Sequence, residues 1–165
     1  MPTTIEIGGH APFGFSAAHT GLHDGQFEPL HGHSFTVTLR LHGRGLDAAG
    51  MLVDFHLVKK ALAEIIAPLR RRTLMPAQPP GGTCTVEDGQ VVITCGGKCY
   101  SLPEQDVALL PVPNTTTEAL AAYLLEQLLP HLHGEPALRR VELVLAEAPD
   151  TCATVVADLP PEAGQ

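Results

Sequence analysis

Apolar and polar residues alternate most regularly in the stretch "HSFTVTLRLHG", residues 33–43. Because successive side chains of a strand point to opposite faces, this alternation predicts a half-buried β-strand over residues 34–42. The apolar face of that strand would carry Phe35, Val37, Leu39 and Leu41. The earlier stretch "TTIEIGGHAPFGFSAAH", residues 3–19, alternates more weakly and predicts a first strand, interrupted by Gly and Pro, that ends near His19.

Two later segments have the pattern of amphipathic helices. Asp54 is expected to cap "FHLVKKALAEIIAPLRR", residues 55–71. Apolar residues at every fourth position predict the buried face of this helix, which would consist of Leu57, Ala61, Ile65 and Leu69. Asn114 or a following Thr is expected to cap a second helix, "TTTEALAAYLLEQLLPHL", residues 115–132.

The remaining elements are strands. Residues 137–158 predict two strands joined by the turn Ala148-Pro149-Asp150. Between the helices, residues 75–113 contain a strong hairpin signal, Asp88-Gly89, flanked by β-rich runs. The run "VALLPVPN", residues 107–114, predicts a short edge strand. The order of elements indicates a single α+β domain over residues 1–165.

Composition narrows the class of protein. Hydrophobic residues make up 44% of 165, which is typical of a globular chain, and the formal charge of −8 argues against a general nucleic-acid binder. There is no apolar run of about 18 residues and no signal-peptide pattern, so no membrane partner is expected. The four cysteines form no CxxC motif, and we expect a cytoplasmic protein with reduced thiols.

The candidate chemistry begins with the motif "EPLHGHSF", residues 28–35. Side chains two apart in an extended segment point to the same face, so His31 and His33 can converge. If the first two strands pair antiparallel, His19 joins them at one end of the ladder. Three imidazoles with an open fourth position are the pattern of a catalytic zinc site. Chance clustering is the alternative, since the chain has nine histidines.

Five short motifs occur in a recognisable order: "FSAAH", "LHGHSFTV", "MLVDF", "PNTTTEALA" and "LVLAEAPDT". On these motifs the chain resembles the 6-pyruvoyl-tetrahydropterin synthase family, which includes 6-carboxy-tetrahydropterin synthase of the queuosine pathway. The resemblance covers nearly all of residues 10–158 apart from residues 75–113. It implies a tunnelling fold (T-fold): a four-stranded antiparallel sheet with two helices on one face, here with an extra β-hairpin inserted between the helices. It also implies a homo-oligomer, a hexamer or an assembly built from trimers.

The resemblance assigns roles residue by residue. It makes His19, His31 and His33 the ligands of Zn²⁺ and Glu147 the carboxylate that anchors the pterin. It makes Thr116, Thr117 and Glu118 further pterin contacts, contributed across a subunit boundary. Each has an ordinary alternative: Glu147 as a charge at a strand end, and "TTTE" as a helix N-terminus with capping residues.

The chain also departs from the family pattern. Usual members have a catalytic Cys shortly before the HGH motif and an Asp-His pair in an LDH motif. Here the Cys is absent, and Glu28 resembles the Glu of folate-linked members that cleave dihydroneopterin triphosphate to 6-hydroxymethyl-dihydropterin. The LDH position holds Leu69-Arg70-Arg71 instead. Arg cannot shuttle protons at neutral pH, although it could bind a triphosphate or interact with the helix C-terminus.

These observations predict a zinc-dependent lyase that acts on the side chain of a 7,8-dihydropterin, with Glu28 as general base. The substrate would be 7,8-dihydroneopterin or its triphosphate. Two alternatives stay open. The protein could make 6-carboxy- or 6-pyruvoyl-tetrahydropterin by a modified mechanism, or it could be a pterin-binding protein without activity.

Overall fold

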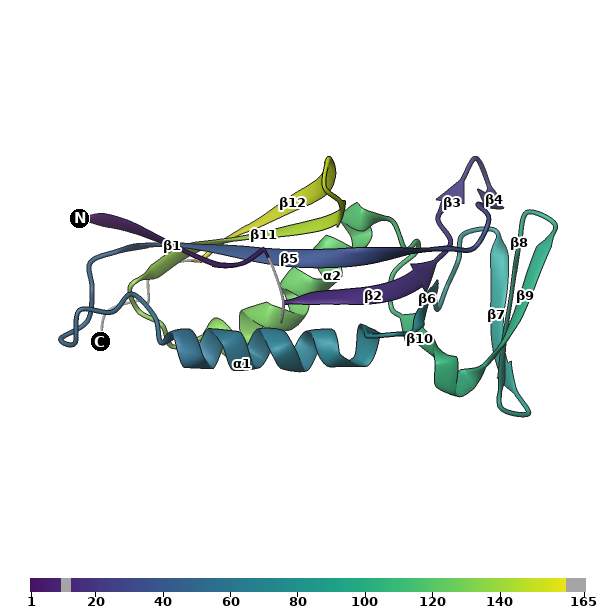
Figure 1. Ribbon diagram of the computed structural model, residues 1–165, viewed down its shortest axis with the longest axis horizontal. Helices are drawn as coiled ribbons and strands as arrows, with labels where there is room; N and C mark the ends of the chain where they lie inside the picture. The colour runs from purple at the N-terminus through teal and green to yellow at the C-terminus, as the bar shows by residue number, and fades with distance from the viewer. Residues whose placement is uncertain (10–12, 160–165) are drawn as a thin grey trace.

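The computed structural model describes residues 1–9 and 13–159, and a long sheet runs through most of its length (Figure 1). The central strand of this sheet is β5 (His31–Arg44), which is longer than the strand predicted over residues 34–42. Four antiparallel strands surround it: β1 (Pro2–Gly8), β2 (Gly14–His19), β11 (Leu138–Ala148) and β12 (Thr151–Asp158). Both β1 and β2 pair with the same side of β5, while β11 pairs with its other side and with β12.

The predicted first strand is therefore two strands. β1 pairs with the C-terminal half of β5 and β2 with its N-terminal half. The Pro12 interruption predicted between them lies outside the described residues.

The predicted apolar face of β5 forms the centre of the core. Phe35, Val37, Leu39 and Leu41 are at most 1% exposed. Both helices cover this face of the sheet, with α1 below the strands and α2 behind them in Figure 1. Helix α1 spans Phe55–Ile66 and α2 spans Thr117–Leu128. The predicted arrangement of two helices on one face is confirmed.

The prediction for the first helix was partly wrong. Asp54 caps it as expected, accepting a hydrogen bond from the His56 N–H at 2.7 Å. The helix, however, ends at Ile66 and continues as a short 3₁₀ turn, η1 (Ala67–Leu69), that contains Pro68. Its buried residues are Val58, Ala61, Leu62 and Ile66, whereas Leu57 is 37% exposed. Ala61 and Leu69 are buried as predicted, and Ile65 is partly buried against the core, so only Leu57 was wrong. A period of 3.6 residues places positions i, i+3, i+4 and i+8 on one face, which a strict spacing of four follows only in part.

The sheet also has a parallel extension that the sequence pattern did not reveal. The strand β6 (Thr73–Pro76), for which no strand was predicted, pairs parallel with β2. The predicted edge strand, β10 (Val107–Leu110), is confirmed and pairs parallel with β6. The four-stranded antiparallel unit predicted for the fold is therefore part of a mixed sheet.

The segment between the helices contains a separate three-stranded antiparallel sheet at one end of the molecule (Figure 1). Its strands are β7 (Gly82–Glu87), β8 (Gln90–Cys95) and β9 (Lys98–Pro103). The predicted Asp88-Gly89 turn joins β7 to β8 with positive φ at both residues, and Gly96-Gly97 makes a second such turn. A two-stranded hairpin of β3 (Leu22–His23) and β4 (Gln26–Phe27), which the sequence pattern did not predict, lies beside this sheet.

Helix α2 begins after the capping residue Thr116, and a 3₁₀ turn, η3 (Leu129–Leu132), follows its last residue. All four cysteines are free thiols, as expected. Among the described residues no helix is both long enough and apolar enough to cross a bilayer.

Candidate metal centre and its surroundings

The three histidines singled out by the sequence converge at one end of the β2–β5 ladder. His19 lies directly opposite His31 in the antiparallel register, and His33 lies opposite Ala17. Because residues two apart share a face, all three side chains project from the face that carries Phe35. Their ring centroids lie 4.6 to 5.1 Å apart, and one nitrogen of each lies within 4.8 Å of the others. A single metal ion could therefore be reached by all three.

Hydrogen bonds orient two of these rings. The Nδ1 of His19 lies 2.7 Å from the Thr115 carbonyl oxygen, and the Nδ1 of His31 lies 2.8 Å from that of Pro29. A carbonyl can only accept, so both Nδ1 atoms carry hydrogen and both Nε2 atoms offer a lone pair. This outer support is typical of histidines that bind metals. The Nε2 of His19 is buried and has no hydrogen-bond partner, which fits a metal-binding nitrogen.

The electrostatic environment also favours neutral imidazole. Burial lowers the pKa of His19, and the neighbouring His31 and His33 lower it further, against the opposing effects of the Thr115 hydrogen bond and of Glu147. Neutral imidazole is the form that binds metal ions. His19 is 4% exposed whereas His31 is exposed, so the centre is open on one side.

The segment Asn114–Thr117 connects several parts of this region. Asn114 was a candidate helix cap, but its side chain accepts from the Leu22 N–H at 2.7 Å and donates to the Leu22 carbonyl at 2.9 Å. Buried Thr115 holds His19 and donates its hydroxyl to the Thr20 carbonyl at 3.0 Å. The sequence pattern gave no signal for these contacts of Asn114 and Thr115, because hydrogen bonds between residues 92 to 96 positions apart leave no periodicity in the sequence.

The candidate pterin residues are partly brought together. Thr117 is buried, and its hydroxyl donates to the carboxylate of half-buried Glu147 within the same chain. Thr116 is the helix cap, with its hydroxyl 3.3 Å from the Ala119 nitrogen. Glu118 is exposed in the first turn of α2. The alternative interpretation of "TTTE" as a capping segment is therefore confirmed for Thr116, and Thr117 has a different role.

Glu28 lies on an exposed segment directly before β5, yet its backbone is firmly held. Its N–H donates to the Gly21 carbonyl at 2.8 Å, and its own carbonyl accepts from the Thr20 hydroxyl at 2.7 Å. Its carboxylate lies over Gly21, where an added Cβ would come within 2.9 Å of Oε2. The absence of a side chain at Gly21 allows this close approach, and Gly21 follows His19 by two residues. The Glu28 carboxylate is thus packed against the chain that leaves the histidine cluster.

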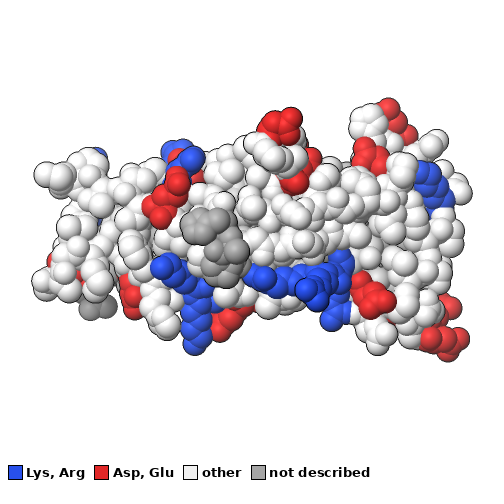
Figure 2. Space-filling model, in the orientation of Figure 1, with Lys and Arg blue, Asp and Glu red and all other residues white. Residues whose placement is uncertain are grey.

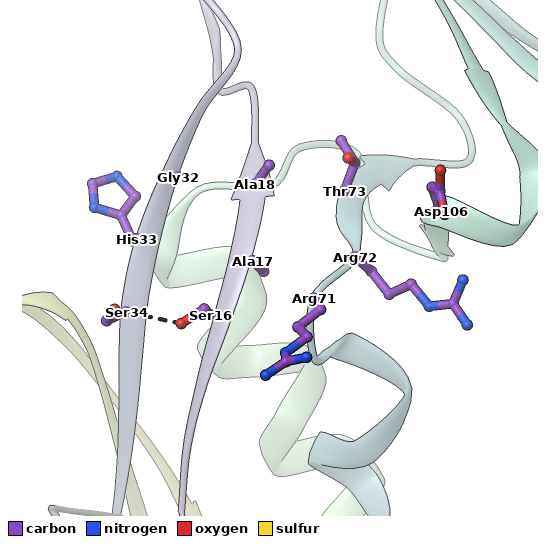
Figure 3. A pocket seen from close by; sticks show the side chains of 10 residues that line it. All are labelled: Ser16, Ala17, Ala18, Gly32, His33, Ser34, Arg71, Arg72, Thr73 and Asp106. Atoms are coloured by element: carbon purple, nitrogen blue, oxygen red, sulfur yellow. Dashed lines mark hydrogen bonds between the residues drawn. The ribbon is translucent and has the colours of Figure 1, made fainter.

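The arginines at the LDH position line depressions beside β2 and β5. Arg71 has a positive φ of 56° and donates its backbone N–H to the Ser16 carbonyl at 2.7 Å. Arg71 and Arg72 line a depression of about 470 Å³ to which Ser16 and His33 also contribute (Figure 3). In Figure 3 the His33 ring points away from this side of the strands. Arg70 and Arg71 also line a neighbouring depression of about 330 Å³.

Basic side chains gather around α1 and the segment after it, whereas acidic side chains are scattered over the rest of the visible face (Figure 2). This basic region suits an anionic group better than it suits proton transfer, because Arg stays protonated at neutral pH.

The fold and the histidine cluster together define a T-fold protein with a centre suited to a metal ion. The chain belongs to the 6-pyruvoyl tetrahydropterin synthase family, whose model matches residues 10–158. It is 32% identical over 125 residues to a putative 6-carboxy-5,6,7,8-tetrahydropterin synthase of Methanocaldococcus jannaschii, covering 75% of this chain and 77% of the relative. Members of this family are synthases that act on pterin side chains.

Solved structures give the same assignment. The chain superimposes on 6-pyruvoyltetrahydropterin synthase of Plasmodium vivax with a TM-score of 0.88 and 27% identity, covering 96% of this chain and 99% of that one. Two further structures of that protein, at 26% identity, carry Ala or Cys in place of a glutamate described as a catalytic residue. Since 96% of this chain is covered, the similarity extends into residues 75–113.

The role of Asn114 leads to a stability prediction. Asn114→Ala removes both partners of the Leu22 backbone, so we expect the free energy of unfolding to fall by about 1–3 kcal/mol in urea denaturation. Gln105→Ala, which removes an exposed amide, is the matched control and should change stability by less than about 0.5 kcal/mol. Equal stability of the two variants would contradict the bridging role of Asn114.

Proposed function

We propose that this protein is a zinc-dependent lyase that cleaves the side chain of 7,8-dihydroneopterin or its triphosphate. The observation that carries the proposal is the convergence of three imidazoles, two of which direct Nδ1 at a carbonyl oxygen and so leave Nε2 for a metal ion. Their nitrogen donor set suits Zn²⁺ with an open coordination position. When bound, zinc would supply Lewis-acid polarisation of a substrate oxygen.

Glu28 is proposed as the general base. Its carboxylate would accept the proton of the side-chain 2′-hydroxyl while the bond between C1′ and C2′ breaks. The electron pair of that bond passes toward the pterin ring, and C1′ is then protonated, which gives 6-hydroxymethyl-dihydropterin and an aldehyde. The packing of the Glu28 carboxylate over Gly21, close in sequence to His19, supports this role. The catalytic glutamate of the Plasmodium vivax protein supports it as well.

Glu147 is proposed as the pterin anchor. A carboxylate can accept two hydrogen bonds at once from the amino group and ring N–H of a pterin. The Thr117 hydroxyl fixes one carboxylate oxygen and so limits the orientations available to Glu147. Thr116 and Glu118 are the sequence neighbours of Thr117, and they remain candidate contacts to the pterin ring.

A second function is favoured by one observation. The Methanocaldococcus jannaschii relative is named as a putative 6-carboxy-5,6,7,8-tetrahydropterin synthase. Formation of a 6-carboxy product from the same substrate is therefore the competing activity, and it would use the same histidines and the same anchor.

The metal assignment predicts one Zn²⁺ per chain. After dialysis against buffered zinc, elemental analysis should find one equivalent in the wild type, and His31→Ala should weaken zinc affinity by at least about 100-fold, the upper range for losing a supporting group. His23→Ala removes an imidazole that is 76% exposed and serves as control. Equal zinc in all three proteins would rule out the histidine centre.

The assignment of Glu28 predicts a specific product. Zinc-loaded wild type incubated with 7,8-dihydroneopterin triphosphate should yield 6-hydroxymethyl-dihydropterin by mass spectrometry. Glu28→Gln should lower kcat by about 10²–10⁴, the range for losing a general base. Glu87→Gln, on exposed β7, is the control. A 6-carboxy product would favour the second function, and intact substrate from the wild type would refute both.

The anchor assignment predicts a loss of pterin affinity. Glu147→Gln should raise the Kd for a dihydropterin, measured by fluorescence, about 10–100-fold, because it removes a charged hydrogen-bond acceptor. Glu126→Gln, exposed on α2, should leave the Kd unchanged. An unchanged Kd in Glu147→Gln would show that the ring is held elsewhere.

A further inference from the structure

The inserted three-stranded sheet makes direct contact with the segment that carries Glu28. Two side chains of β9 provide the contact, and both lie on the same face because they are two positions apart. The Lys98 ammonium donates to the Phe27 carbonyl. The Tyr100 hydroxyl donates to the Glu28 carbonyl at 3.1 Å. Two successive carbonyls at the candidate base are therefore held by the insertion.

Packing strengthens this attachment. Phe27 is 1% exposed and lies in a small apolar cluster with Met75, Ile93 and Cys95, separate from the main core. The ring of Tyr100 lies 6.1 Å from that of Phe27, centroid to centroid. The turn between β8 and β9 also lies close to the turn between β3 and β4. A Cβ added at Gly96 would lie 2.4 Å from the Gly25 carbonyl oxygen. The insertion thus buries one face of the hairpin that precedes Glu28.

The Glu28 carbonyl accepts hydrogen bonds from two directions. The Thr20 hydroxyl, one residue beyond His19, donates from the main sheet, and Tyr100 donates from the insertion. This pair of donors fixes the Glu28 backbone relative to the chain leaving the histidine cluster. Both hydrogen bonds end on the Glu28 backbone carbonyl and not on its carboxylate.

We propose that Lys98 and Tyr100 are positioning residues, through which the inserted sheet holds the Glu28 carboxylate at its working distance from the histidine centre. This inference rests on the function proposed above for Glu28. A base on an exposed segment outside regular structure needs such support, because a displacement of about 1 Å can cost about 100-fold in rate. The insertion is then part of the catalytic apparatus.

The test compares Tyr100→Phe, Lys98→Met and the double variant with the wild type, all loaded with zinc. Tyr100→Phe keeps the ring that packs on Phe27 and removes only the hydroxyl. We expect kcat for the dihydroneopterin substrate to fall about 10-fold in each single variant and about 100-fold in the double variant. Zinc content, the pterin Kd and the melting temperature should stay close to wild type. Ser101→Ala removes an exposed hydroxyl from the opposite face of β9 and is the control.

A double-mutant cycle separates positioning from general structural support. In the Glu28→Gln background the base is already lost, so adding Tyr100→Phe should cause no further decrease in kcat. A purely structural role would lower the residual kcat by the same factor as in the wild type and would overturn the proposal. So would an unchanged kcat in the Lys98→Met, Tyr100→Phe double variant.

Hydrogen exchange distinguishes failure of the positioning role of Lys98 and Tyr100 from failure of the function proposed for Glu28. In the double variant, amides of residues 20–29 should exchange about 10-fold faster, whereas β11 should be unaffected. Faster exchange with an inactive wild type would refute the function proposed for Glu28, and with it the positioning role. Unchanged exchange with an active wild type would refute the positioning role alone.

Discussion

The antiparallel register between β2 and β5 is the constraint on which the site depends. It places His19 opposite His31 and leaves His33 on the same face, two positions further along. A slip of one residue would turn the β2 side chains to the other face and separate His19 from its partners. The register is fixed by burial, because Phe15 stacks on Phe35 at 5.0 Å and both must stay in the core. The same apolar packing that stabilises the sheet therefore assembles the histidine cluster.

The segment Asn114–Thr117 is the second organising element. Within four residues it pairs with the Leu22 backbone, orients His19, caps α2 and fixes Glu147. These contacts join the end of β2, strand β3, helix α2 and strand β11 at one place. Short polar side chains suit this work, since they can bond to backbone groups close by without filling space. A helix N-terminus thereby serves as a connector between the candidate metal centre and the candidate pterin anchor.

Much of the fold and part of the candidate site could be predicted from the sequence. Local signals located β5, the Asp54 cap, the Asp88-Gly89 turn and the last two strands, because alternation and turn chemistry act over a few residues. The three histidines were found through the alternation of β5 and an assumed pairing. The parallel strand β6 was missed because its four residues, which include Pro76, carry no period. The strict spacing of four wrongly added Leu57 to the buried face of α1 and missed Val58, Leu62 and Ile66. The partners of Asn114 and Glu28, more distant in the chain, were beyond any local pattern.

The three histidines and Glu28 lie on different kinds of structural element. The imidazoles project from strands whose positions the core determines, so the candidate metal centre is built on the sheet itself. Glu28 instead lies on a connecting segment, where a change of residue disturbs little of the core. A fold built this way can keep one centre and one anchor while the group before the HGH motif changes from a thiol to a carboxylate. The cost is that a group on a connecting segment must be held by neighbouring elements, and the donors to the backbone of the candidate base Glu28 come from Thr20 and from the inserted sheet.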